Sequence, residues 1–81
     1  LNGTNFGGSD LTYVSFRFAS LKGANLKGAK LHNADFSKAD LTDADLTGAD
    51  VKDADFDGAT LTGVKGLDRL ASRDTARNLQ N

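Results

Sequence analysis

Aspartates are the residues of this chain whose number and spacing could support chemistry. Residues 34–59 hold eight aspartates and no glutamate, and carboxylate oxygens are ligands that Ca²⁺ prefers. The run DADFDG at 53–58 matches the first half of an EF-hand loop. The second half does not match, because Val64 stands at the twelfth position, where the loop requires a bidentate glutamate, and no flanking helices are indicated. We therefore predict no metal site in this stretch.

Other catalytic groups are few. His32 is the only histidine, and a catalytic or metal role would need partners of defined geometry, so we expect it to be an exposed surface residue. There is no cysteine for a disulfide or a thiolate zinc site, no nucleophile motif, and no G-x-G-x-x-G loop after a strand. These observations predict no catalytic residues, no cofactor-binding residues and no metal ligands, and hence a protein that is not an enzyme.

Composition bounds the molecule to one small domain. The 81 residues are 38% hydrophobic and carry a net charge of −1, so the chain as a whole is neither a polyanion nor a polycation. No apolar run approaches the length of a membrane span, and we expect no membrane association. The chain begins at Leu1 and contains no methionine, as expected of a trimmed, processed or partial chain.

Large apolar residues recur at every fifth position, which we call the central position. The series is Leu1, Phe6, Leu11, Phe16, Leu21, Leu26, Leu31, Phe36, Leu41, Leu46, Val51, Phe56 and Leu61. A small residue, usually alanine, stands two positions earlier, and glycine, asparagine or aspartate usually stands two positions later. Tyr13, Phe18 and Lys38 interrupt this later column.

A period of five fits neither a helix nor a regular strand, but it fits a short extended segment followed by a turn. Residues two apart in an extended segment point to one side, and glycine, asparagine and aspartate tolerate the positive φ of a tight turn. A second period of twenty separates Phe16, Phe36 and Phe56. A coil of four five-residue sides would stack these rings about 4.8 Å apart in the core.

The units ANLKG (24–28), ADLTD (39–43), ADLTG (44–48) and ADFDG (54–58) resemble the A-(D/N)-L-x-x consensus of pentapeptide-repeat proteins. The resemblance covers about residues 1–65. It implies an all-β solenoid, a right-handed quadrilateral parallel β-helix of about three coils, with no catalytic residues common to the family. The first units depart from the consensus, since Thr4, Ser9 and Val14 replace alanine and Tyr13 and Phe18 replace the turn residue.

Most of the aspartates precede a central residue and should point away from the core as a solvated coat, where they can bond nearby backbone groups. Residues 34–63 carry a net charge of −6, against +3 in residues 1–33 and +2 in residues 64–81. Some pentapeptide-repeat proteins bind DNA gyrase by resembling DNA. Three coils would make a rod on the order of 15 Å, a length over which DNA presents roughly nine charges. This chain has fewer charges, and they are spread over all four faces.

The two ends differ. Residues 66–81 lose the repeat and favour helix formers, so we predict a short C-terminal α-helix that caps the solenoid, giving the divisions 1–65 and 66–81. At the other end the repeat is already in register at Leu1, beside Tyr13 and Phe18 at normally outward sites. We expect self-association or docking of a protein partner at this N-terminal end, and no direct binding of nucleic acid.

The sequence therefore favours a non-catalytic structural or scaffolding protein that presents a rigid solenoid surface to an unidentified protein. The alternative is a DNA mimic that inhibits or protects a gyrase or topoisomerase. Many proteins of this kind occur in photosynthetic bacteria and chloroplast lumens, so the resemblance implies a lumenal or periplasmic location, while a cytoplasmic one stays open.

Overall fold

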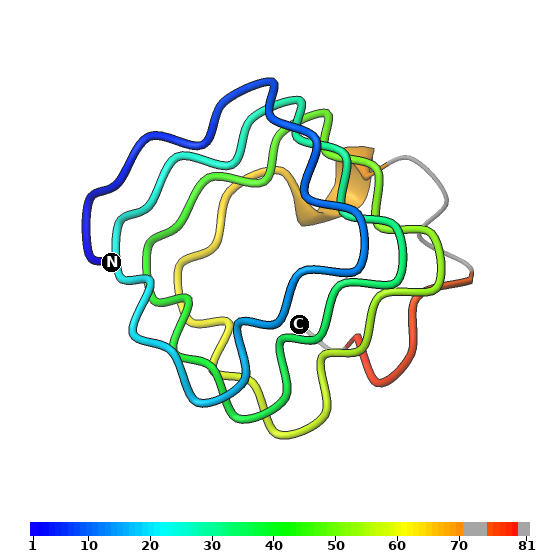
Figure 1. Cartoon of the computed structure of the whole chain (residues 1–81). Coiled ribbons are helices and arrows are strands. Elements are labelled where there is room, and N and C mark those ends of the chain that lie inside the picture. The colour runs from blue at the N-terminus through cyan, green and yellow to red at the C-terminus, as the bar shows by residue number, and fades with distance from the viewer. Residues whose placement is uncertain (71–74, 80–81) are drawn as a thin grey trace.

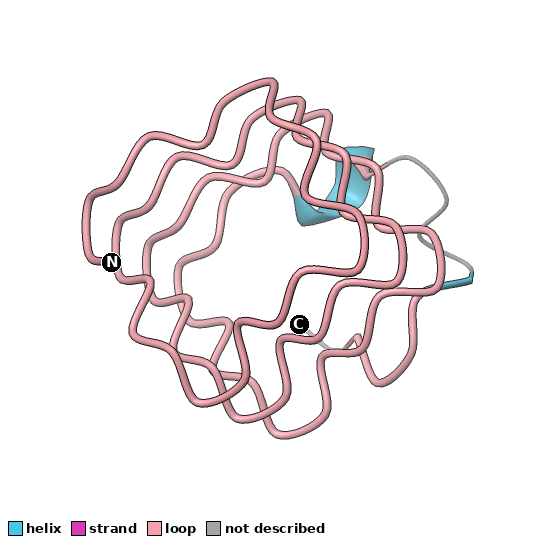
Figure 2. Ribbon diagram, viewed as in Figure 1, coloured by secondary structure: helices cyan, strands magenta, loops and turns pink. Residues whose placement is uncertain are grey.

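A computed structural model describes residues 1–70 and 75–79. The chain winds repeatedly around a single axis, so that each level of the winding lies on the one before it (Figure 1). Parallel bridges join residues twenty apart, as in Asn5↔Asn25, Asn25↔Asp45 and Asp45↔Lys65. One coil is therefore twenty residues, or four repeats. The described residues form isolated bridges and turns, without continuous strands, and the 3₁₀ helix η1 spans Leu67–Arg69 (Figure 2).

Backbone hydrogen bonds between coils follow directly from the five-residue unit. From Phe6 to Leu46, the N–H of each central residue donates to the carbonyl nineteen positions ahead, as from Phe6 to Asn25 at 2.7 Å. The N–H of the residue before the centre donates in the opposite direction, as from Asn25 to Thr4 at 2.9 Å. A unit too short for a strand of its own thus satisfies its polar backbone groups through the coils above and below it.

The corners are tight turns that require a left-handed residue. In each turn the N–H of the small residue donates to the preceding central carbonyl, as from Ala24 to Leu21 at 3.1 Å. The residue just before the small residue, which we call the corner residue, has positive φ, as a type II turn requires of its third residue. Glycines fill many corners, but Tyr13 (φ 63°) and Phe18 (φ 62°) adopt the same conformation. The departures of the first units from the consensus therefore leave the backbone geometry unchanged.

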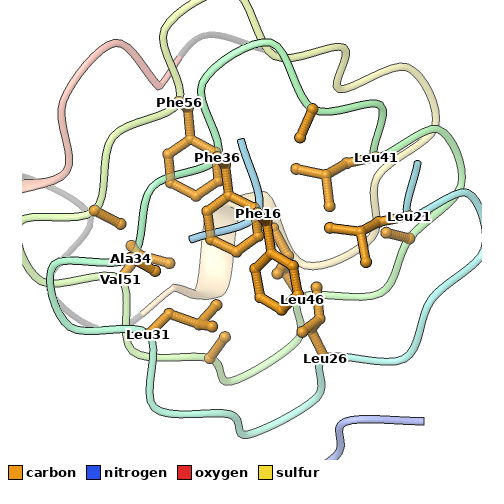
Figure 3. Packing of buried hydrophobic residues seen from close by; sticks show 14 of the residues in the cluster. Phe16, Leu21, Leu26, Leu31, Ala34, Phe36, Leu41, Leu46, Val51 and Phe56 are labelled. Carbon is orange, nitrogen blue, oxygen red and sulfur yellow. The ribbon is translucent and has the colours of Figure 1, made fainter. Parts of the chain in front are cut away.

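The core is the axis of the solenoid, filled by the central residues and the alanines. Phe16, Phe36 and Phe56 form one pile, as the twenty-residue period predicts (Figure 3). Ring centroids are 5.2 Å apart between Phe16 and Phe36, and 4.9 Å apart between Phe36 and Phe56, whose planes differ by 1°. Burial weakens towards the N-terminal end, where Leu1 is 60% exposed.

The C-terminal segment differs from the α-helix predicted for residues 66–81. Helix η1 ends at Arg69, and Leu70 is extended (ψ 134°). The repeat stops at Gly66, where an added Cβ would lie 2.5 Å from the Cα of Thr47. Arg77 returns to the ladder, because its N–H donates to Ala54 and its carbonyl accepts from Phe56.

The physical reason is competition for the last coil's open edge. An unpaired edge offers backbone groups that must be satisfied, and the helix propensity of a short segment is too weak to outweigh that pairing. Leu67 is buried against the core at the start of the segment.

Residues 71–74 and 80–81, which also belong to the predicted helix, lie outside the described residues. Within the described residues, no helix is long and apolar enough to cross a membrane.

Candidate functional site

The aspartates before the central residues accept hydrogen bonds from the nearby backbone. Each side chain folds over the next turn, and its Oδ1 accepts the N–H two residues further on. These bonds measure 2.8 Å from Ser37 to Asp35, 3.0 Å from Thr42 to Asp40 and 3.0 Å from Thr47 to Asp45. Asparagine does the same at Asn5 and Asn25. The sequence-based expectation that these side chains bond nearby backbone groups is confirmed.

Threonine strengthens this arrangement where it follows the central residue. The hydroxyls of Thr12, Thr42 and Thr47 donate to the same aspartate oxygens at 2.5–2.6 Å. These hydroxyl bonds, followed by the backbone N–H bonds, lower the pKa of Asp10, Asp40 and Asp45 below its ordinary value, because they favour the ionised carboxylate. Hydrogen bonds from Ser37 likewise lower the pKa of Asp35.

The EF-hand-like aspartates do not converge on one point. Asp53 occupies a corner with φ 57°. Asp55 accepts the N–H of Asp57 at 3.0 Å and the side-chain amide of Asn78 at 3.0 Å. Across residues 1–70 and 75–79, no three His, Cys, Asp or Glu side chains are grouped so that they could hold a metal ion.

His32 is not the exposed residue that the sequence led us to expect. Its side chain is only 25% exposed, and its Nε2 lies 2.6 Å from Oδ2 of Asp50. The expectation was wrong because the vertical neighbours of His32, twenty residues away in the sequence, are Thr12 and Lys52, and Asp50 is not among them. The residue after a centre also meets, diagonally, the residue before a centre in the next coil.

This diagonal contact has a separation of eighteen residues and recurs around the solenoid. Arg17 lies 3.9 Å from Asp35, and Lys22 lies 3.7 Å from Asp40. Ser20 donates to Asn2 at 2.6 Å with the same separation. Once the coil length is known, a scan of the sequence at this spacing would have found the His32–Asp50 pair.

Apart from Leu1, the exposed large hydrophobic side chains of the described residues stand at two aromatic corners. Tyr13 is 75% exposed and Phe18 is 68% exposed, and they occupy successive corners of the first coil. Arg17 lies between them in the sequence, and its guanidinium carbon is 5.4 Å from the centre of the Phe18 ring. A ring exposed at positive φ neither fills the core nor suits the turn.

The side between these corners continues downward through two more coils. We call residues 13–18, 33–38 and 53–58 the acidic–aromatic face. Bridges from Ser15 to Asp35 and from Asp35 to Asp55 hold its three levels in register. Its four aspartates, one arginine and one lysine give a net charge of −2, and the lowest level holds three of the aspartates.

The register of twenty and the repeated corner geometry agree with the family comparison. The model of the pentapeptide repeats matches residues 1–28 and 24–63, in eight copies. The chain belongs to the pentapeptide-repeat family. Membership gives the fold as a right-handed quadrilateral β-helix, and proteins of this family are generally structural or non-catalytic.

Two solved pentapeptide-repeat proteins are similar over most of this chain. One comes from the thylakoid lumen of Arabidopsis thaliana, with 46% identity and a TM-score of 0.80, over 83% of this chain and 47% of that one. The other, Rfr23, comes from the cyanobacterium Cyanothece 51142, with 30% identity and a TM-score of 0.83, over 88% of this chain and 48% of that one. No curated protein sequence matched the chain. This pentapeptide-repeat chain thus spans about half the length of these two solved relatives.

Proposed function

We propose that this chain is a non-catalytic scaffolding module that binds a protein partner through the side of its N-terminal coil. The observation that carries the proposal is the exposure of Tyr13 and Phe18 at corners with positive φ. Tyrosine and phenylalanine are enriched in protein interfaces, where they contribute large contact area. The positive φ of Tyr13 and Phe18 costs free energy in the folded state. This cost favours a role for the two residues in binding and not in stability.

The chemistry of the remaining surface supports a binding role over catalysis. No pocket is found in the part of the chain that the structure describes, and small-molecule sites are usually concave. The outward carboxylates that precede a central residue are engaged with backbone N–H groups. The proposed function is therefore argued from the surface, since a fold does not by itself imply an activity.

We further propose a solenoid of about three coils in which residues 66–81 act as the cap of the C-terminal edge. The burial of Leu67 and the pairing of Arg77 with the last coil support this role. The resemblance to a thylakoid-lumen protein of Arabidopsis thaliana supports a lumenal location.

The test is capture of partners from a plant thylakoid-lumen extract by the immobilised 81-residue chain. A double variant, Tyr13→Gly with Phe18→Gly, should lose the captured protein. The matched control is Asn33→Gly with Lys38→Gly, which changes the same two corners one coil lower. Equal capture by the wild type and the aromatic double variant would contradict the proposal. Sedimentation of the wild type over a concentration series separates capture of a partner from self-association.

The alternative, imitation of DNA, predicts a different result. A DNA mimic would inhibit or protect a gyrase in a supercoiling assay, and loss of Tyr13 and Phe18 would leave that effect unchanged. The bonds between outward aspartates and the backbone give those carboxylates a structural purpose that does not require a DNA-binding target.

A further inference from the structure

The acidic–aromatic face carries two features that are not explained by the fold. The first is the exposed ring of Tyr13, for which the described residues provide no aromatic or cationic partner. The second is a pair of carboxylates two coils below, on Asp53 and Asp57. Neither accepts a hydrogen bond or forms an ion pair within residues 1–70 and 75–79.

These carboxylates differ from the others on the same face. Asp35 accepts the N–H of Ser37 at 2.8 Å and lies 3.9 Å from Arg17. Asp55 accepts from the backbone of Asp57 and from Asn78. The side chains of Asp53 and Asp57 stand at positions where the repeat does not use a carboxylate for capping, and Asp57 is exposed.

The placement of these groups is regular. Tyr13, Asn33 and Asp53 occupy the same corner in successive coils, since bridges two residues further on join Ser15, Asp35 and Asp55. The positions of Tyr13 and Asp53 are two coil spacings apart, a distance of about 10 Å. An extended peptide covers that distance in about three residues, so one short segment can reach both groups.

Both features attract the same kind of group. An aromatic ring binds a lysine or arginine side chain over its face, and an unpaired carboxylate binds the same side chains by charge-assisted hydrogen bonds. The basic residues of the face do not neutralise them, because Arg17 already contacts Phe18 and Asp35, and no ion pair joins Lys38 to a carboxylate in the described residues.

We propose that the acidic–aromatic face is a docking site for a lysine- or arginine-rich segment of a partner protein, an inference that rests on the proposed function. The net charge of the face, −2, complements such a segment. A nucleic acid is disfavoured at this face by like charge. A second copy is disfavoured too, because it would bring the same face and the same acidic stretch, residues 34–63 with net charge −6.

The experiment is an NMR titration of the ¹⁵N-labelled 81-residue chain with a short synthetic peptide rich in lysine and arginine that contains one leucine. A peptide with glutamate at the basic positions is the negative control. The amide resonances of residues 13–18 and 53–58 should shift when the basic peptide is added. The basic peptide should bind more weakly at physiological salt than at low salt. The glutamate peptide should cause no shifts.

Variants test each half of the site. Tyr13→Gly should weaken binding of the basic peptide by about tenfold, as for an interface anchor. Asp53→Asn combined with Asp57→Asn should weaken it by about fivefold and remove most of its salt dependence. The control is Asp43→Asn, an aspartate at a corner outside this face with φ 61°. It should bind like the wild type.

Failure of this inference is distinct from failure of the proposed function. Absence of shifts with the basic peptide at low salt, shifts centred on another side, or unchanged affinity in the Tyr13 and Asp53/Asp57 variants would overturn the docking site. If the lumen extract then yields a partner without a basic segment, captured only when Tyr13 and Phe18 are present, the proposed function stands and the partner chemistry inferred here is wrong.

Discussion

Replacing Tyr13 by glycine should make the protein more stable, although the change removes a whole side chain. Tyr13 has φ 63°, in the left-handed region where glycine fills corners such as Gly8 (φ 69°) and Gly23 (φ 67°). An L-residue with a Cβ is disfavoured there by roughly 1–2 kcal/mol. The ring is 75% exposed, so its removal forfeits little burial.

The gain is offset in part by the unfolded state. Glycine loses more conformational entropy on folding, which costs about 0.5–1 kcal/mol. The net expectation is a stabilisation of about 0.5–1 kcal/mol, which for a domain of this size raises Tm by about 2–8 °C. Phe18→Gly should be close to neutral, because it also removes the contact between Arg17 and the Phe18 ring at 5.4 Å, worth about 0.5–1 kcal/mol at an exposed site.

Differential scanning calorimetry and urea unfolding would measure both variants against the wild type. The reverse substitution, Gly8→Tyr, is the matched control, since an added Cβ at Gly8 meets no atom within 4 Å and strain alone should lower its stability. A Tyr13→Gly protein with a lower Tm than the wild type would refute the reasoning, because it would mean that the Tyr13 ring stabilises the folded state.

Three further predictions follow from the core, the last corner and the capping aspartates. Phe36→Ala removes the middle ring of the pile and should destabilise the fold by about 3–5 kcal/mol in urea unfolding; a cost under about 1 kcal/mol would argue against a packed pile. Gly66→Ala should cost more than Gly28→Ala by thermal unfolding, because the added Cβ meets backbone 2.5 Å away at Gly66 and open space at Gly28. The pKa of Asp40 is lowered in the folded state, so its stabilising effect is complete above the unfolded pKa of about 3.9 and is lost as pH falls through the lower folded value. Asp40→Asn, which keeps the acceptor oxygen, should therefore weaken the acid dependence of stability measured below about pH 4, and an unchanged acid profile would contradict that assignment.

The repeat made most of the fold predictable, because every level of the structure depends on the same five positions. The spacing of Phe16, Phe36 and Phe56 alone defines the coil length, and their measured stacking agrees with it. The corners were predictable for a similar reason. The turn imposes positive φ on whatever residue stands there, so even Tyr13 and Phe18 conform.

The sequence was less informative where contacts cross the period. The pairing of His32 with Asp50 at 2.6 Å depends on a diagonal between coils, which a comparison of residues twenty apart does not reveal. The C-terminal segment was mispredicted for a different reason. The composition of the segment indicates only its local helix propensity. In the structure, the backbone of Arg77 forms hydrogen bonds with the open edge of the last coil, and no residue pattern within the segment predicts that pairing.

The absence of glutamate separates structural carboxylates from those available for binding. An aspartate Oδ1 is short enough to reach the N–H two residues on, as Asp45 reaches Thr47 at 3.0 Å, and an extra methylene would place the carboxylate beyond this turn. Aspartate, or asparagine as at Asn5 and Asn25, is thus favoured before a central residue for reasons of backbone geometry. The repeat makes no such demand of Asp57, or of an aromatic ring at Tyr13. Because local rules are most often broken at functional sites, these exceptions to the repeat are where a binding partner should be sought.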